Sequence, residues 1–186
     1  MRGFLPGSIW HADDPETVQI REVYARYGLA MYKAQVLEHG IVNAVIIANV
    51  LPTISEYTDR LAWEEDFDRA FVRELAKTFG NMLRALEPLR LPDGIMVRLR
   101  EAKLKRDRLA HHFFREHDEN FLQQGGRITM ITECEATIEF FSAVDADLEA
   151  FMRPLRERYG ITDEWAEEKV ASALAAGEPD SGSAGP

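Results

Sequence analysis

The feature that most constrains the fold is the spacing of the apolar residues, which recur every three or four positions through most of the chain. This spacing places apolar side chains along one side of an α-helix. Asp14 followed by Pro15 is a typical helix start, with an N-cap residue and then a proline in the first turn. No segment shows the alternation of apolar and polar residues expected of a half-buried strand. The sequence therefore predicts an all-α fold, an antiparallel helical bundle of four main helices with a short C-terminal helix after it.

Helix start and stop signals divide the chain into segments without a second domain. The first helix is expected from Pro15 to the Leu51-Pro52-Thr53 stop, and Gly125-Gly126 is expected to form a turn. Further helices are expected at about 66–87, from about 92 through the stretch "KRDRLAHHFFREH", after residue 126, and at about 162–175. The predicted organisation is an N-terminal extension at 1–14, a helical bundle at 15–157, an acidic C-terminal helix within 158–176 and a disordered tail at 177–186.

Composition narrows the functional classes. The formal net charge is −10, which disfavours general nucleic-acid binding, yet residues 98–115 hold seven basic and only two acidic side chains. A single cysteine, Cys134, excludes an intramolecular disulfide. Neither a signal peptide nor an apolar run of roughly 20 residues is recognised. We therefore expect a cytoplasmic protein that does not associate with a membrane.

Within "KRDRLAHHFFREH", Arg106 falls in the same helical stripe as Leu99, Ala102 and Leu109. A guanidinium in a core-facing stripe is costly unless it is paired. Glu38 falls in an apolar register of the first helix and could supply the carboxylate. One interpretation of Arg106 is therefore a buried, purely structural ion pair with Glu38.

The two adjacent histidines differ in position. His111 shares a second, largely apolar stripe with Leu104 and Phe114, and Asp107 lies one turn before it, where its carboxylate could accept a hydrogen bond from the imidazole. His112 lies on a fully polar face. Two apolar faces on one helix indicate that one packs inside the bundle and the other against a second chain.

The segment Arg106-Asp107 followed by His111 after four intervening residues resembles the signature of the HEPN (higher eukaryotes and prokaryotes nucleotide-binding) family. The resemblance implies a metal-independent endoribonuclease without a cofactor, acting as a homodimer whose two motifs face each other. In that reading His111 transfers protons at the ribose 2′-hydroxyl or the leaving 5′-oxygen, Arg106 holds the scissile phosphate, and Asp107 orients the catalytic group. The products would carry 2′,3′-cyclic phosphate ends. The resemblance also implies a defence or toxin role with a possible cognate antitoxin protein.

Other residues enter with less defined roles. Glu38 and His112 are candidate auxiliary residues, and the basic side chains expected to contact RNA are Lys103, Lys105, Arg108 and Arg115. The main alternative is a non-catalytic HEPN-like bundle that binds a nucleotide, RNA or a protein partner. No metal site is expected, because the Glu-x-x-His pairs of a di-iron bundle are absent and the spacing of His11, His39 and His117 does not favour zinc.

Overall fold

The computed structural model describes residues 14–177, and this part of the chain contains α-helices, short 3₁₀ helices and loops but no β-strand. The predicted all-α fold is confirmed. The N-terminal extension and most of the C-terminal tail lie outside the described residues. The elements are α1 (Pro15–Asn49), η1 (Leu51–Glu56), α2 (Arg60–Leu75), α3 (Phe79–Leu86), η2 (Glu87–Leu89), α4 (Asp93–His111), α5 (Phe113–Glu116), α6 (Asp118–Leu122), α7 (Gln124–Glu157) and α8 (Asp163–Gly177).

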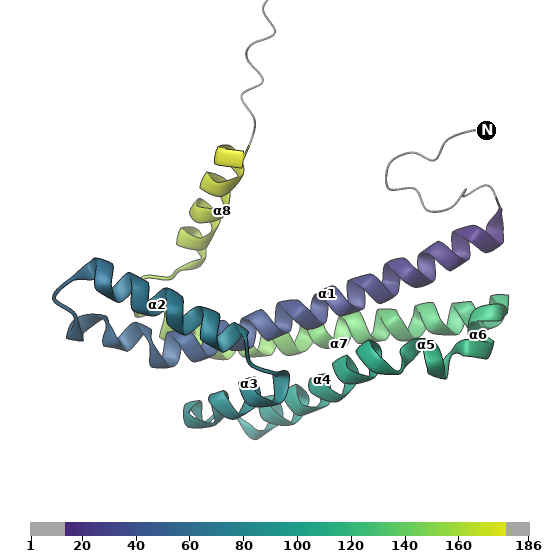
Figure 1. Ribbon diagram of the computed structural model, residues 1–186, viewed down its shortest axis with the longest axis horizontal. Coiled ribbons are helices and arrows are strands. Elements are labelled where there is room, and N and C mark those ends of the chain that lie inside the picture. The colour runs from purple at the N-terminus through teal and green to yellow at the C-terminus, as the bar shows by residue number, and fades with distance from the viewer. Residues whose placement is uncertain (1–13, 178–186) are drawn as a thin grey trace, which may run out of the picture.

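The two longest helices, α1 and α7, lie side by side along the long axis of the molecule and run parallel (Figure 1). Near their N-terminal ends, Gln19 accepts a hydrogen bond from Arg127. Further along both helices, Arg26 pairs with Glu135 at 3.0 Å. The expectation of an antiparallel bundle is therefore wrong for this pair, because the chain returns to the starting end of α1 through α4 before α7 begins.

Helix α4 runs antiparallel to both long helices. Arg98, near its start, pairs with Asp147 in the second half of α7, whereas Arg108, near its end, pairs with Glu133 in the first half. The antiparallel order expected from the sequence thus holds for α4 against α1 and α7, although α1 and α7 run parallel to each other.

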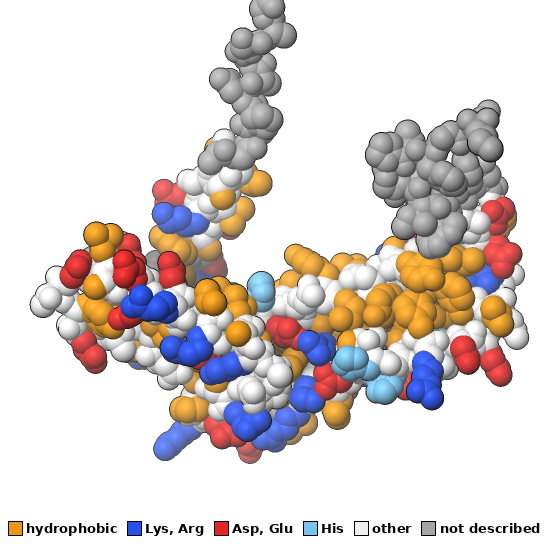
Figure 2. All heavy atoms as spheres, in the orientation of Figure 1, with side chains coloured by type: hydrophobic (Ala, Val, Ile, Leu, Met, Phe, Trp, Pro, Cys, Tyr) orange, Lys and Arg blue, Asp and Glu red, His pale blue; other side chains and the backbone are white. Residues whose placement is uncertain are grey.

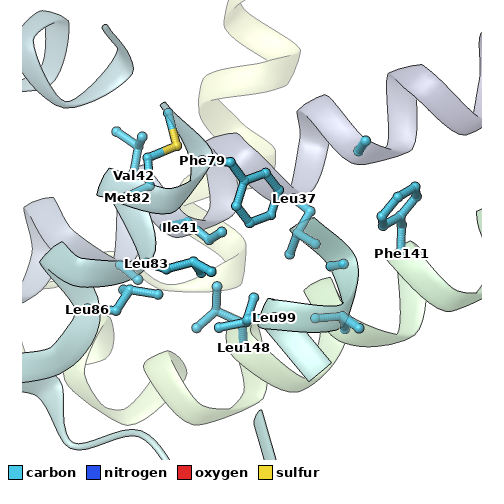
Figure 3. Close-up of a cluster of buried hydrophobic side chains, with 14 of the residues drawn as sticks. Leu37, Ile41, Val42, Phe79, Met82, Leu83, Leu86, Leu99, Phe141 and Leu148 are labelled. Carbon is cyan, nitrogen blue, oxygen red and sulfur yellow. The ribbon is translucent and has the colours of Figure 1, made fainter. Parts of the chain in front are cut away.

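The core lies where α1, α3, α4 and α7 meet (Figure 3). Helix α3 is short, but its apolar residues fall at positions i, i+3, i+4 and i+7, so they all face the same way. These residues, Phe79, Met82, Leu83 and Leu86, are buried. They pack with side chains that include Leu37, Ile41, Leu99 and Leu148.

Two of the expected helices end earlier than the apolar periodicity indicated. The helix expected at 66–87 is interrupted after Leu75, because Thr78 adopts an extended conformation and becomes the N-cap of α3. The helix expected to continue through His117 ends at His111, and His112 leaves the helical conformation with φ −130°. The expected turn at Gly125-Gly126 is instead the first turn of α7.

Residues 15–56 include a window that is long and apolar enough to cross a membrane by length and composition. About half of that window (44%) is buried in the protein. Its side chains form much of the core with α3, α4 and α7. A core helix of a folded domain passes the same test, and the packing of α1 accounts for its apolar composition.

Candidate functional site

The motif residues Arg106, Asp107 and His111 lie in the second half of α4. Arg106 reaches α1, where its Nε donates to Glu38 Oε1 at 2.9 Å. The side chain of Arg106 is 31% exposed, so the ion pair is half-buried rather than enclosed in the core. The predicted pairing of Arg106 with Glu38 is confirmed, and it links α4 to α1.

Asp107 continues this chain of charges. Its carboxylate accepts hydrogen bonds from Lys103 Nζ at 2.5 Å and from Arg106 Nη1 at 3.2 Å. Burial opposes ionisation of this carboxyl, but the hydrogen bonds from Lys103 and Arg106 outweigh it and hold the pKa of Asp107 below its ordinary value. Two cations and two carboxylates thus alternate across the site in the order Lys103, Asp107, Arg106, Glu38.

His111 is the last residue of α4 and is exposed. The hydrogen bond expected from it to Asp107 is not formed, and the Asp107 carboxylate accepts from Lys103 and Arg106 instead. Within residues 14–177, the imidazole of His111 has no hydrogen bond and only a ring contact to His112, with centroids 6.3 Å apart. His111 is therefore accessible to a ligand from solvent, and no protein group described here orients its ring.

The predicted RNA-contacting cations are mostly engaged with acidic side chains. Lys105 lies 3.4 Å from Glu101 and over the ring of Phe140, and Lys103 is held by Asp107. Arg108 pairs with Glu116 at 2.6 Å and with Glu133. Arg115 is exposed and forms no ion pair with any described residue. The positive charge of this segment is thus largely neutralised at short range.

Arg108 contacts a different helix from the one that Arg106 contacts. Arg106 reaches Glu38 on α1, whereas Arg108 reaches Glu133 on α7. Burial opposes ionisation of Glu133, but hydrogen bonds, chiefly from Arg108 and also from His117, lower the pKa of this carboxyl. Arg108 therefore stabilises the contact between α4 and α7, whereas Arg106 stabilises the contact between α4 and α1.

Sequence reasoning missed the polar network around His117. This histidine is 6% exposed; its Nε2 lies 2.9 Å from Glu133 Oε2 and its Nδ1 lies 2.9 Å from Asn120 Nδ2. An amide nitrogen can only donate, so Nδ1 accepts and the proton of the neutral ring lies on Nε2, where it is donated to Glu133. His117 could be placed on a buried stripe from its spacing, but Glu133 lies on another helix and no local pattern indicated it.

The second apolar stripe of the sequence is not continuous in the structure. Leu104 is 67% exposed, but Phe114 packs in an aromatic cluster with Tyr24, Tyr27 and Phe121. The end of α4 at His111 turns the following residues toward α1, which is why the stripe does not extend to Phe114. Figure 2 shows hydrophobic side chains gathered over the N-terminal half of α1 and the adjoining helices, with histidine side chains at the surface beneath them.

No group of three or more His, Cys, Asp or Glu side chains suited to a metal ion occurs among residues 14–177. Of the histidines considered for zinc, His11 lies outside the described residues, His39 is exposed on α1, and His117 is held by Glu133 and Asn120. Burial raises the pKa of the Cys134 thiol to about 11, which leaves this thiol protonated and unreactive at neutral pH.

Comparison with known proteins gives no relative: no protein-family profile, no curated protein and no solved structure matches this chain.

Proposed function

We propose that this protein is a metal-independent endoribonuclease of the HEPN type, in which Arg106 and His111 act on the scissile phosphodiester. The observation that carries the proposal is the position of these residues. His111 is exposed at the end of α4, and the half-buried Arg106 guanidinium lies on the same helix, five residues before it.

The chemistry divides between the two side chains. An imidazole can take the 2′-hydroxyl proton of a ribose or return a proton to the leaving 5′-oxygen. A guanidinium can hold two phosphate oxygens and offset the charge that develops on them. Glu38 and Asp107 hold Nε and Nη1 of Arg106, while Nη2 has no hydrogen-bond partner among the described residues. Nη2 is therefore the donor that is directed to the phosphate.

A composite site formed by two copies of the chain would supply the second acid–base group that the cleavage needs. Cleavage by transesterification uses one group as a base and one as an acid, and a single His111 supplies only one of them in each step. In a homodimer whose α4 helices face each other, the second acid–base group is His111 of the partner copy. His112 is the other candidate, since its ring lies next to that of His111.

The test is cleavage of a mixed pool of cellular RNA by the purified protein in excess EDTA, comparing the wild type with His111→Ala and His112→Ala. We expect cleavage with cyclic-phosphate ends by the wild type and by His112→Ala, and a loss of at least about a hundredfold in His111→Ala. Equal activity of the two variants would show that His111 is not the acid–base group. A DNA pool is the matched substrate control, because DNA lacks the attacking hydroxyl.

The second candidate function is a non-catalytic bundle that binds a nucleotide, RNA or a protein. The ion pairs of Arg106 with Glu38 and Asp107 favour it, because a phosphate would have to compete with two carboxylates already in place. In that case RNA remains uncut in EDTA, and truncation of Arg106 affects stability alone.

A further inference from the structure

A groove runs along the side of α1 that faces away from the motif. Two cavities, of about 270 Å³ and about 420 Å³, adjoin there and share the lining residues Asn43, Ile47 and Glu149. Neighbouring residues of α1 face these two sides of the helix. Glu38 reaches Arg106 on α4, whereas His39 and Gly40 line the smaller cavity together with residues of α7. The groove and the Arg106–His111 site thus lie on different faces of the same helix.

The larger cavity is mainly apolar. It lies between α1, η1, α2, the C-terminal part of α7 and the first turn of α8, the helix that rises from the end of the bundle in Figure 1. Its aromatic walls are Phe67 and Phe71, whose rings stack with centroids 6.5 Å apart, and Trp165. Its volume is within the range of small-molecule sites, and such sites combine apolar walls with a few polar groups.

The smaller cavity is lined by a carboxylate, Asp145, that has no ion-pair partner among the described residues. Asp145 is half-buried on α7 and forms no hydrogen bond or ion pair with a described residue. Its Oδ1 lies directly over Gly40, where a Cβ would be only 2.6 Å away, so the absence of a side chain at residue 40 makes room for this carboxylate.

The charges around Asp145 leave the groove acidic. Lys33 on α1 attracts this carboxylate without forming an ion pair, and Glu149, one turn along α7, repels it. Among residues 14–177, Arg156 is the one arginine or lysine that lines the groove, and it pairs with Glu149 and Asp163. His39 lines the opposite wall. Among the described residues, Asp145 is thus the carboxylate of this groove that a ligand can pair with.

We propose that this groove binds a small organic amine, whose ammonium group pairs with Asp145 and whose apolar body lies between Phe67, Phe71 and Trp165. The shared lining residues connect the acidic and apolar parts, and Asp145 and Glu149 are separated by about 6 Å along α7, which a short alkyl chain spans. A cation with an apolar end matches both parts of the groove, the Asp145 carboxylate of the smaller cavity and the aromatic walls of the larger cavity.

The experiment is isothermal titration of the full-length protein at neutral pH and low salt with phenylbutylamine, phenylbutanol and phenylbutyrate. These probes carry a phenylalkyl body of nearly the same length, and their end groups are positive, neutral and negative, respectively. The amine is expected to bind at least about tenfold more tightly than the alcohol, the gain of one ion pair in a partly buried site, and the carboxylate is expected to bind most weakly. Equal binding of amine and alcohol, or no binding of the amine, would overturn the proposal.

Variants separate the two parts of the site. Asp145→Asn is expected to weaken the amine about tenfold and leave the alcohol unchanged, whereas Trp165→Ala weakens both. The matched control is Glu139→Gln, which removes one exposed carboxylate from the same helix without touching the groove. Thermal unfolding of each variant checks that it is folded. If Glu139→Gln weakens amine binding as much as Asp145→Asn does, the effect is one of overall charge, and the assignment of Asp145 as the ammonium partner is wrong.

Discussion

At the scale of single residues, the half-buried pair of Arg106 and Glu38 is the contact with the clearest energetic consequence. Replacing Arg106 by Met strands the Glu38 carboxylate, and replacing Glu38 by Gln leaves the guanidinium with Asp107 as its remaining carboxylate, so each change should cost about 1–3 kcal/mol. The double variant should cost about 1 kcal/mol less than the two single costs together, because the two groups interact directly. Urea unfolding measures the cycle.

Lys105→Met is the matched control for this cycle. Lys105 lies next to Arg106 on α4 and also forms an ion pair, but with Glu101 of its own helix, and its side chain is more exposed than that of Arg106. We expect a change of less than about 0.5 kcal/mol for it. If the free-energy costs of the two single variants simply add in the double variant, Arg106 and Glu38 are not coupled. That result would argue against a structural role of the pair and against the proposal that Glu38 fixes Arg106 for phosphate binding.

The pKa values of Asp145 and Asp107 are shifted in opposite directions, so the two carboxyl groups should affect the pH dependence of stability with opposite signs. Burial, with a smaller contribution from Glu149, raises the pKa of Asp145 above its usual 3.8, so ionising this group disfavours the folded state. Asp145→Asn should therefore raise the melting temperature at neutral pH, and the gain should vanish as the pH falls below 3.8. Asp107 has a lowered pKa, so Asp107→Asn should lose stability at neutral pH, and this loss should disappear only at more acidic pH. Melting curves across this pH range distinguish the two signs.

At the scale of the helices, the first turn of α7 contains two glycines that should respond in opposite ways to the same change. A Cβ on Gly126 would lie 2.2 Å from the backbone oxygen of Asn120, so Gly126→Ala must push α6 away from α7. A Cβ on Gly125 would meet nothing within 4 Å. Gly125→Ala should stabilise by about 0.5–1 kcal/mol through reduced freedom of the unfolded chain, whereas Gly126→Ala should destabilise by more than that. Thermal unfolding compares them, and equal effects would contradict the close α6–α7 contact.

Local signals predicted the helices well and their partners poorly. The start of α1 at Pro15 follows from Asp14, which accepts from Thr17 N at 2.8 Å as an N-cap should. The breaks at Thr78 and His112 were missed, because each depends on where the next helix must pack and not on a Gly or Pro in the sequence. The parallel course of α1 and α7 depends on the path of the helices between them, which no local pattern specifies.

The candidate site shows the same limit. Glu38 could be paired with Arg106 because both are charged residues in apolar registers, and such residues must find each other. The pairing of Asp107 with Lys103 competes with the expected bond to His111, and both options lie at helical spacing, so the sequence alone did not decide between them. Glu133 and Asp145 were not anticipated, since a carboxylate on a mostly polar helix surface gives no sign of being half-buried.

At the scale of the whole molecule, the proposed nuclease depends on a second copy, and α4 offers the surface for it. Val97, Leu104 and His111 are spaced by seven residues, which places them in one line on a helix. Val97 and Leu104 are both exposed. If two copies meet along this line, their His111 side chains come to the same seam, and light scattering after size exclusion should give twice the chain mass of 21.2 kDa.

Leu104→Glu tests this arrangement, because a charge in the seam should yield monomers and abolish RNA cleavage without lowering the melting temperature. Val72→Glu is the control, an equally exposed apolar residue on α2 that should change neither the mass nor the cleavage. A monomeric wild type that still cuts RNA in EDTA would remove the composite site and leave His111, with His112 beside it, to supply both the acid and the base within one chain. A dimer that withstands Leu104→Glu would place the interface on another face, and the two His111 side chains would then have no structural reason to meet.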